Sequence, residues 1–255
     1  MRFCVVIPAY NEAATIREVV VRALAVSDRV IVIDDGSVDG TAQVLKDLTA
    51  TVLRHDTNRG KAAALWSGFE RALADGAEAI ITLDGDGQHR PEDVPRFIEA
   101  AETYPNHIVI GSRIGERDAF PKPRYYANRV ANFWISWAAG YRIDDSQSGF
   151  RLYPATLLQR VHIAHDRAHG FVFESEILIE AARVGVQSVA LQIAALYARS
   201  ARPSHFRAVL DVARITRMVA WKLLSRAMYP QGLWRALFSP RAPTVLSGKC
   251  ARDNK

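Results

Sequence analysis

The stretches FCVVIPAYNEA (Phe3–Ala13) and VIVIDDGSVDGT (Val30–Thr41) decide the fold class of this sequence. Each begins with a short apolar run rich in β-branched residues and then turns polar, as a buried strand does where it leaves a sheet. A helical pattern at Ala13–Ala25 separates the two runs. A strand, a helix and a second strand in this order are typical of a parallel βαβ unit. We therefore expect an α/β protein.

The same alternation continues to about residue 113, which extends the expected mainly parallel sheet with helices on its faces. The expected strands are Phe3–Ile7, Val30–Ile33, Thr51–Leu53, Ala79–Leu83 and His107–Ile110. The expected helices are Ala13–Ala25, Thr41–Asp47, Lys61–Ala74 and Pro91–Thr103. Later segments are a helix at about Arg124–Ala139, a helix at about Phe171–Val184, an apolar run at Val186–Tyr197 and a helical pattern at Pro203–Arg226. We expect a domain over 1–202, a helical segment over 203–238 and a disordered tail over 239–255.

Length and composition narrow the class of protein. With 255 residues, 49% hydrophobic and 24% charged, the chain suits one globular domain and excludes wholesale disorder. Two cysteines cannot form a disulfide framework, which favours a reducing compartment. The longest uncharged stretches, Val130–Tyr141 and Val184–Ala198, fall short of the roughly 20 residues that cross a bilayer. The start of the chain lacks the apolar region of a secretory signal, so we expect a cytoplasmic protein.

The net charge of +6 is concentrated near the C-terminus. Residues 199–255 hold twelve Lys and Arg against two Asp, a net charge of +10, whereas residues 1–198 carry −4. A helical wheel of Pro203–Arg226 separates an apolar side from a basic side. The apolar side holds Phe206, Val209, Val212, Ala213, Val219, Leu223 and Leu224, and the basic side holds Arg207, Arg214, Arg217 and Lys222. We expect this segment, with Trp221, Tyr229 and Trp234, to lie on the cytoplasmic face of an anionic membrane, and burial against the domain is the alternative.

Acidic residues gather where two expected strands end. Asp34 and Asp35 follow the second run, and the sequence DGDGQH (84–89) follows the fourth. Because parallel strands end at one edge of the sheet, several carboxylates there need a cation or hydrogen-bond donors to offset their repulsion. Asp84, Asp86 and Gln88 offer the oxygen ligands that suit Mg²⁺ or Mn²⁺. Asp34 and Asp35 suit hydrogen bonds to a ribose or a base.

Two common nucleotide motifs are absent from the sequence. No GxGxxG follows the first apolar run, which argues against a nicotinamide oxidoreductase, and no GxxxxGK[ST] loop of the standard NTPases is present. The acidic strand ends therefore need a different explanation.

Six motifs occur along the first part of the chain: PAYNEA (8–13), IDDGSVDGT (33–41), NRGK (58–61), LDGDGQH (83–89), GSR (111–113) and SGFR (148–151). Taken together, they resemble the family 2 glycosyltransferases of the GT-A fold, and most of all the polyprenyl-phosphate mannose and glucose synthases. They occur in order over about residues 1–205. The resemblance implies a Rossmann-like, mainly parallel sheet flanked by helices, followed here by the basic amphipathic helix. It also implies an inverting transfer from a GDP- or UDP-linked sugar to a lipid-linked or other membrane-associated acceptor.

The resemblance assigns roles to individual residues. The nucleoside and donor site would comprise Pro8, Tyr10, Glu12, Asp34, Asp35, Lys61 and Asp84. Asp84, Asp86 and Gln88 would hold Mg²⁺ or Mn²⁺ at the donor diphosphate. Arg113, Arg124 and Arg199 would bind the diphosphate or an acceptor phosphate, for which planar guanidinium groups are well suited.

The acceptor is the least defined part of the site. The lipid-phosphate synthases commonly read R-x-x-G-x-S-K after the last strand, whereas this chain has RSARPSH (199–205), with Arg202 at the glycine position and His205 at the lysine position. An acceptor phosphate is already anionic and needs no general base. For an acceptor hydroxyl, Asp145 is the expected base and Asp144 the second choice. Glu174 and Glu176 are expected to lie on a helix face or to orient a loop.

Two other functions stay open from the residues alone. A nucleotidyltransferase on a similar sheet would carry a glycine-rich loop after the first strand, which PAYNEA is not. A non-catalytic basic protein would bind nucleic acid through the C-terminal segment, but aromatic residues are not interleaved with arginines there as RNA binding requires. We therefore expect a nucleoside-diphosphate sugar as partner and no nucleic acid.

Overall fold

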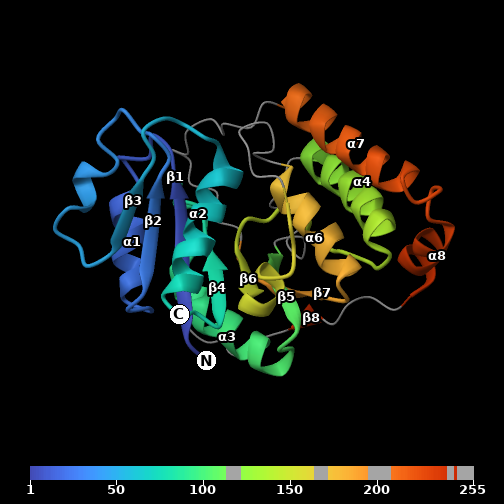
Figure 1. Ribbon diagram of the computed structural model, residues 1–255, viewed down its shortest axis with the longest axis horizontal. Coiled ribbons are helices and arrows are strands. Elements are labelled where there is room, and N and C mark those ends of the chain that lie inside the picture. The colour runs from blue at the N-terminus through green and yellow to red at the C-terminus, as the bar shows by residue number, and fades with distance from the viewer. Residues whose placement is uncertain (113–121, 164–171, 195–207, 240–243, 246–255) are drawn as a thin grey trace.

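The protein is an eight-stranded sheet covered by helices on both faces (Figure 1). The computed structural model describes residues 1–112, 122–163, 172–194, 208–239 and 244–245. The strands are β1 (Phe3–Ala9), β2 (Val30–Asp34), β3 (Thr51–Arg54), β4 (Ala79–Thr82), β5 (His107–Ser112), β6 (Arg151–Pro154), β7 (Gln187–Gln192) and β8 (Thr244–Val245). The α-helices are α1 (Ile16–Leu24), α2 (Lys61–Ala74), α3 (Val94–Thr103), α4 (Lys122–Ala139), α5 (Ala155–Leu158), α6 (Phe173–Arg183), α7 (Ala208–Leu224) and α8 (Pro230–Phe238). Two 3₁₀ turns are η1 (Gln43–Leu45) and η2 (Pro91–Asp93).

The sheet is mainly parallel, and one strand reverses direction. Its order is β3-β2-β1-β4-β6-β5-β7-β8, and β6 pairs antiparallel with both β4 and β5. The order changes direction at β1, which lies between β2 and β4. In open parallel sheets, ligands bind beyond the carboxyl ends of the strands at such a switch point. The topology therefore predicts a ligand site at the loops after β1, β2 and β4.

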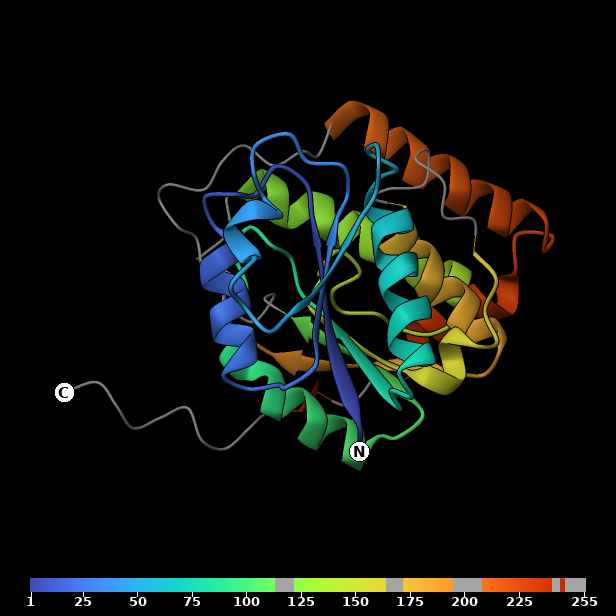
Figure 2. The same cartoon turned by 60° about the vertical axis from the view of Figure 1, so that its left-hand side comes forward.

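The central strands are buried on both faces because alternate residues enter two separate cores. In β1, Val5 and Ile7 pack toward α1 and α3, whereas Cys4 and Val6 pack toward α2. Figure 2 shows α1 and α3 on one side of the sheet and α2, α6 and α7 on the other. Near-continuous apolar runs such as VIVI are typical of strands covered on both sides.

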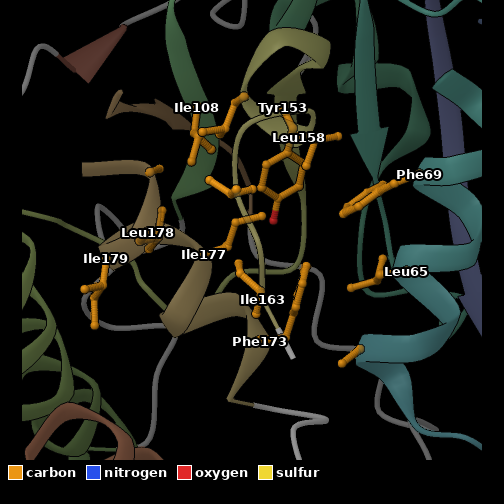
Figure 3. Close-up of a cluster of buried hydrophobic side chains, with 14 of the residues drawn as sticks. Leu65, Phe69, Ile108, Tyr153, Leu158, Ile163, Phe173, Ile177, Leu178 and Ile179 are labelled. Carbon is orange, nitrogen blue, oxygen red and sulfur yellow. The ribbon is translucent and has the colours of Figure 1, made fainter. Parts of the chain in front are cut away.

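The larger core lies between the sheet, α2 and α6 (Figure 3). Phe69 from α2, Tyr153 from β6 and Phe173 from α6 meet there, with the rings of Phe69 and Tyr153 5.4 Å apart and those of Phe69 and Phe173 6.1 Å apart. The helix α2 can approach the sheet closely because it carries Gly68, where a Cβ atom would lie 2.4 Å from Cγ1 of Val6. Close packing of α2 fixes its first residue, Lys61, at the sheet edge.

The expected fold class is confirmed, with corrections to individual elements. The segment expected as a helix over 41–47 forms only the 3₁₀ turn η1, in which Leu45 is the one buried residue, so a longer helix would gain little burial. The first helix begins at Ile16 because side chains of the 37–41 loop bind the backbone before it. The strand β6 was not expected, and β8 lies inside the segment 239–255 that the sequence suggests is disordered.

The wheel drawn for the C-terminal helix is partly wrong. Ile215, Val219 and Leu223 of α7 are buried in the core that α4 and α6 share. Lys222, expected on the basic side, contacts carboxylates on α6, whereas Leu224, expected on the apolar side, is 64% exposed. The packing alternative therefore accounts for one face of α7. No helix among the described residues combines the length and apolarity needed to cross a bilayer.

Candidate active site

The loops after β1 and β2 are joined at the switch point. The backbone N–H of Asn11 donates to Oγ of Ser37 at 2.8 Å, and that of Glu12 donates to Oγ1 of Thr41 at 2.9 Å. Asn11 has a φ of 57°, which turns the chain back toward the 37–41 loop. Of the expected donor-site residues, Pro8, Tyr10 and Glu12 lie at this edge, and all three are half-buried. The motifs PAYNEA and DDGSVDGT thus form one structure.

Asp35 holds the segment that leads into α2. One of its oxygens, Oδ1, contacts Nδ1 of His55 at 2.7 Å and accepts the N–H of Arg59 at 2.9 Å. The other, Oδ2, accepts the N–H of Gly60 at 2.7 Å. The Asp35 side chain is buried, so these contacts explain how its charge is stabilised there. Its expected contact with the nucleoside stays a prediction, and its position sets Lys61, the next residue after Gly60.

Asp34 is fully buried at the end of β2. Its Oδ1 accepts the N–H of Ser37 at 2.9 Å, which closes the turn after the strand. Its Oδ2 lies 3.4 Å from Nε of Arg54 without a hydrogen bond. This carboxylate is therefore stabilised by a turn and by a nearby cation.

Lys61 lies between two carboxylates from different parts of the chain. Its Nζ is 2.7 Å from Oδ1 of Asp84, after β4, and 2.7 Å from Oε1 of Glu174, on α6. Burial works to lower the pKa of Lys61, but the charges of Asp84 and Glu174 outweigh it and raise the pKa above its ordinary value. The ammonium is therefore charged and links α2, β4 and α6 at the carboxyl edge of the sheet.

The segment DGDGQH forms a tight turn after β4. Oδ1 of Asp86 accepts the N–H of Gln88 at 2.9 Å, and Gly87 adopts a φ of 76°. His89 is buried, and its Nδ1 accepts the N–H of Asp84 at 3.2 Å. The turn is therefore anchored at both ends, while Asp84, Asp86 and Gln88 stay partly exposed.

These three residues fit a hard divalent cation by the chemistry of their donor atoms. Two carboxylates and one amide supply only oxygen, which Mg²⁺ and Mn²⁺ prefer. Within the described part of the chain, no group of three His, Cys, Asp or Glu side chains is placed to hold a metal ion. A cation at this turn would therefore draw further oxygen ligands from a bound diphosphate or from water.

The loop that carries Asp145 is braced against the same edge. Asp145 is buried, with its Oδ1 accepting the N–H of Gln147 at 3.2 Å. The fully buried Arg151 donates to the backbone oxygens of Ser146, Ser148 and Glu174, at 2.8, 2.7 and 2.6 Å. A Cβ atom on Gly149 would lie 2.8 Å from Oδ2 of Asp84, so this loop passes directly beside the DGDGQH turn. The expected base thus lies on a loop that adjoins the expected metal turn.

Three expected phosphate contacts fall outside the described residues or side chains. Arg113 and Arg199 are not among the described residues, and the same holds for Arg202 and His205. The backbone of Arg124 belongs to α4, and its side chain is not described. Their roles stay predictions from the sequence.

The sequence did not predict the contact of Glu174 with Lys61. Glu174 was expected to lie on a helix face, but it is 6% exposed and contacts Lys61 at the center of the site. A signal was present in FESE, because acidic residues on a mostly buried helix need cations to compensate their charge. Glu176 is the second case: its Oε1 lies 2.8 Å from Nζ of Lys222.

Comparison with known proteins agrees with this geometry. The profile described as Glycosyl transferase family 2 matches residues 4–167. The chain belongs to this family. An undecaprenyl-phosphate mannosyltransferase of Micrococcus luteus is 30% identical over 204 residues, which cover 76% of this chain and 83% of the relative. A UDP-N-acetylglucosamine–dolichyl-phosphate N-acetylglucosaminyltransferase of Methanococcus voltae is 31% identical over 60% of this chain and 70% of the relative.

Solved structures support the GT-A fold of this family 2 glycosyltransferase. Glucosyl-3-phosphoglycerate synthase from Mycobacterium tuberculosis, in complex with Mn²⁺, UDP and glucosyl-3-phosphoglycerate, superposes with a TM-score of 0.60. It is 23% identical, and the match covers 88% of this chain and 79% of the synthase. The enzyme class expected from the six motifs is thus confirmed.

Proposed function

We propose that this family 2 glycosyltransferase transfers a sugar, with inversion, from a GDP- or UDP-linked donor to a polyprenyl phosphate. The observation that carries the proposal is the meeting of Lys61, Asp84 and Glu174 at the switch point, beside the DGDGQH turn. The carboxylates there can hold a cation, and the cation together with nearby basic groups can stabilise the negative charge of a departing nucleoside diphosphate.

The residues of the chain divide the work of the reaction. Pro8, Tyr10, Glu12, Asp34 and Asp35 would line or support the nucleoside side. Arg113, Arg124 and Arg199 would neutralise phosphate oxygens as negative charge builds on the leaving group.

Asp84, Asp86 and Gln88 would hold Mg²⁺ or Mn²⁺. The bound cation supplies charge stabilisation for the diphosphate leaving group. The Mn²⁺, Mg²⁺ and UDP found in the synthase complexes support this assignment by analogy of fold.

A lipid-linked phosphate is favoured as acceptor because the curated relatives with polyprenyl-phosphate names cover most of this chain. Such an acceptor is anionic and attacks without a general base. Asp145 would then position the acceptor, and would serve as base only for a hydroxyl acceptor. A soluble phosphorylated acceptor is the second candidate, supported by the phosphoglyceric acid complexes of the synthase.

A surface for the membrane is available on α4, α7 and α8. Nine of the twelve exposed large apolar side chains among the described residues belong to these helices and the turn before α8, so they are concentrated in one part of the chain. They are Val130, Phe133, Trp134, Trp221, Leu224, Met228, Trp234, Leu237 and Phe238. Figure 1 shows the three helices together on the side of the molecule away from β3.

The charge of the same region favours an anionic bilayer over a second protein copy. Residues 208–239 contain five Lys and Arg and one Asp. Exposed Trp and Phe suit the headgroup zone, and each basic residue near an anionic surface contributes about 1 kcal/mol. The proposal places the protein peripherally at the cytoplasmic face.

The reaction is tested with a panel of GDP- and UDP-sugars and Mn²⁺, offered with polyprenyl phosphate, polyprenol or 3-phosphoglycerate. Sugar transfer to polyprenyl phosphate alone is expected. Transfer to 3-phosphoglycerate alone would replace the lipid acceptor. In a parallel reaction that contains a nucleoside triphosphate and a sugar 1-phosphate, release of pyrophosphate would indicate a nucleotidyltransferase. Tight binding of RNA without any turnover would favour the non-catalytic alternative.

Membrane binding is tested by sedimentation with liposomes that contain anionic lipid, at low and high salt. The variant Trp234→Ser/Phe238→Ser removes two exposed rings whose centroids lie 4.4 Å apart, and should lose most liposome binding. The matched control Val38→Ser changes an exposed apolar residue near β2 and should bind as wild type does. Equal liposome binding by both variants would contradict the proposed membrane surface on α4, α7 and α8. A change in the oligomeric state of the Trp234→Ser/Phe238→Ser variant would indicate that this surface is an interface between two copies of the chain.

A further inference from the structure

The Lys61 bridge, defined as Lys61 with Asp84 and Glu174, carries more negative than positive charge. One ammonium is shared at 2.7 Å by two carboxylates. The set therefore has a formal charge of −1, and its side chains are 21%, 27% and 7% exposed. Charges that are this poorly solvated act strongly on a neighbouring ion.

Lys61 and Glu174 are held in place by different helices, α2 and α6. Lys61 begins α2 directly after Gly60, whose N–H is bound by Asp35. Glu174 lies in the first turn of α6, where its backbone oxygen accepts from Arg151 at 2.6 Å. The position of the ammonium between the carboxylates is thus set by the fold, and it is shared at equal distance by Asp84 and Glu174.

We propose that Glu174 is a positioning residue for the metal site, which acts by sharing the Lys61 ammonium with Asp84, so that this ammonium does not fully neutralise Asp84. The inference rests on the proposed function, because it takes Asp84 as a ligand of the divalent cation. With Glu174 in contact, Asp84 keeps enough negative charge to bind the cation. Without that contact, Lys61 and Asp84 form a closed neutral pair that competes with the cation.

This mechanism predicts effects of opposite sign on Mn²⁺ affinity. Lys61→Met removes the competing ammonium and should strengthen Mn²⁺ binding about ten-fold, and Glu174→Gln should weaken it about ten-fold, the usual scale of coupling between contacting groups. The charge of Glu174 alone would give the same signs through space. A variant that keeps the charge and loses the contact is therefore needed.

Glu174→Asp is that variant. It retains the carboxylate but withdraws it by one carbon–carbon bond, about 1.5 Å, from Lys61. If contact with Lys61 is what matters, Glu174→Asp should weaken Mn²⁺ binding nearly as much as Glu174→Gln. In the Lys61→Met background the same Asp substitution should have no effect, because no ammonium is left to position.

Glu176→Gln provides the matched control. Glu176 lies on the same helix and contacts Lys222 on α7, and Lys222 keeps its contact with Glu180 when Glu176 is neutralised. The variant removes the same charge from α6 without touching Lys61. Its Mn²⁺ affinity should stay within about two-fold of wild type, the precision expected for residues without shared partners.

The experiment is a Mn²⁺ titration of the full chain followed by electron paramagnetic resonance, with saturating UDP and, in parallel, GDP. The expected order of Mn²⁺ affinity is Lys61→Met, then wild type with Glu176→Gln, then Glu174→Asp with Glu174→Gln. Wild-type affinity in Glu174→Asp overturns the inference and leaves the proposed function standing. Absence of Mn²⁺ binding in the wild type with either nucleotide instead overturns the metal part of the proposed function.

Discussion

The sheet edge at β1, β2 and β4 buries charged side chains, whereas the helices α4, α7 and α8 expose apolar ones. At the edge formed by β1, β2 and β4, acidic side chains turn inward and are bound by backbone N–H groups, as Asp34 and Asp35 illustrate. On α4, α7 and α8, aromatic side chains turn outward, and Trp134 and Trp234 are 43% and 66% exposed. Buried charge and exposed apolar surface both cost stability, so each is retained where function requires it.

Buried charges and exposed apolar side chains are both exceptions to ordinary burial, and each marks a candidate functional region. In the proposed function, the charged edge binds the diphosphate and the apolar helices contact the lipid. Lys61, Glu174 and Arg151 connect the two regions through α6, which packs on α7. Substitutions in either region should therefore separate chemistry from membrane contact.

The largest effect is expected for Asp86→Asn at the edge. Loss of a charge that faces the cation should lower turnover about a hundred-fold or more, the scale of removing one preorganised stabilising group. The fold should survive because Asp86 is partly exposed and lies in a turn. The measurement is the rate of sugar transfer with Mn²⁺, alongside excess EDTA on the wild type.

The control for this variant is Asp28→Asn, which removes an exposed carboxylate before β2, at the opposite edge of the sheet. It should leave the rate unchanged. Full activity of Asp86→Asn, or of wild type in EDTA, would contradict the metal assignment.

Substitutions of the adjacent residues Leu223 and Leu224 compare a buried with an exposed apolar side chain on the same helix. Leu223 is 2% exposed and Leu224 is 64% exposed. Leu223→Ala should lower the free energy of unfolding by about 2–4 kcal/mol through cavity formation, whereas Leu224→Ala should change it by less than about 0.5 kcal/mol. Urea denaturation measures both.

Liposome binding should show the reverse order, with Leu224→Ala weaker than Leu223→Ala. Point variants are preferable to deletion of the whole C-terminal segment, because a deletion would remove Ile215, Val219 and Leu223 from the core. Equal unfolding free energies of the two variants would contradict the packing of α7.

The arginines expected at the phosphates are predicted to tolerate lysine poorly. Arg113→Lys, Arg124→Lys and Arg199→Lys keep the charge but lose the planar fork that binds two phosphate oxygens. Each should lower kcat/KM about ten-fold or more, as for loss of one charge-assisted hydrogen bond. Varying donor and acceptor concentrations separately assigns each arginine to one phosphate, and wild-type kinetics in all three would argue against a shared phosphate site.

The sequence predicted the strands β1 to β5, the acidic strand ends and the family because these depend on local pattern. FCVVI and VIVI are short continuous apolar runs, as expected for strands buried on both faces, and DGDGQH carries its own turn residues. Contacts between distant segments were missed, since nothing local links Lys61 to Glu174, 113 residues later. The prediction of the buried face of α7 was partly wrong for a related reason. A helical wheel identifies an apolar side, but the positions of α4 and α6 decide which residues of α7 are buried.

The smallest effect is expected where the loops after β1 and β2 join. Asp39 accepts hydrogen bonds from the N–H of Ala13 at 3.0 Å and from Oγ1 of Thr41. Partial burial works to raise the pKa of Asp39, but these hydrogen bonds lower it below its ordinary value. A carboxylate with a lowered folded pKa adds stability above its unfolded pKa of about 4, and loses it as the pH falls through the lower folded value.

Because Asp39 is exposed, solvent screening limits this contribution to less than about 1 kcal/mol. Wild type should therefore lose slightly more stability than Asp39→Asn when the pH falls from about 5 to about 3, the range around that unfolded pKa. Urea denaturation across this range, with Asp28→Asn as control, measures the difference. Parallel curves for wild type and Asp39→Asn would mean that the hydrogen bonds of Asp39 do not stabilise the joined loops, and that the bonds of Asn11 to Ser37 and of Glu12 to Thr41 join them instead.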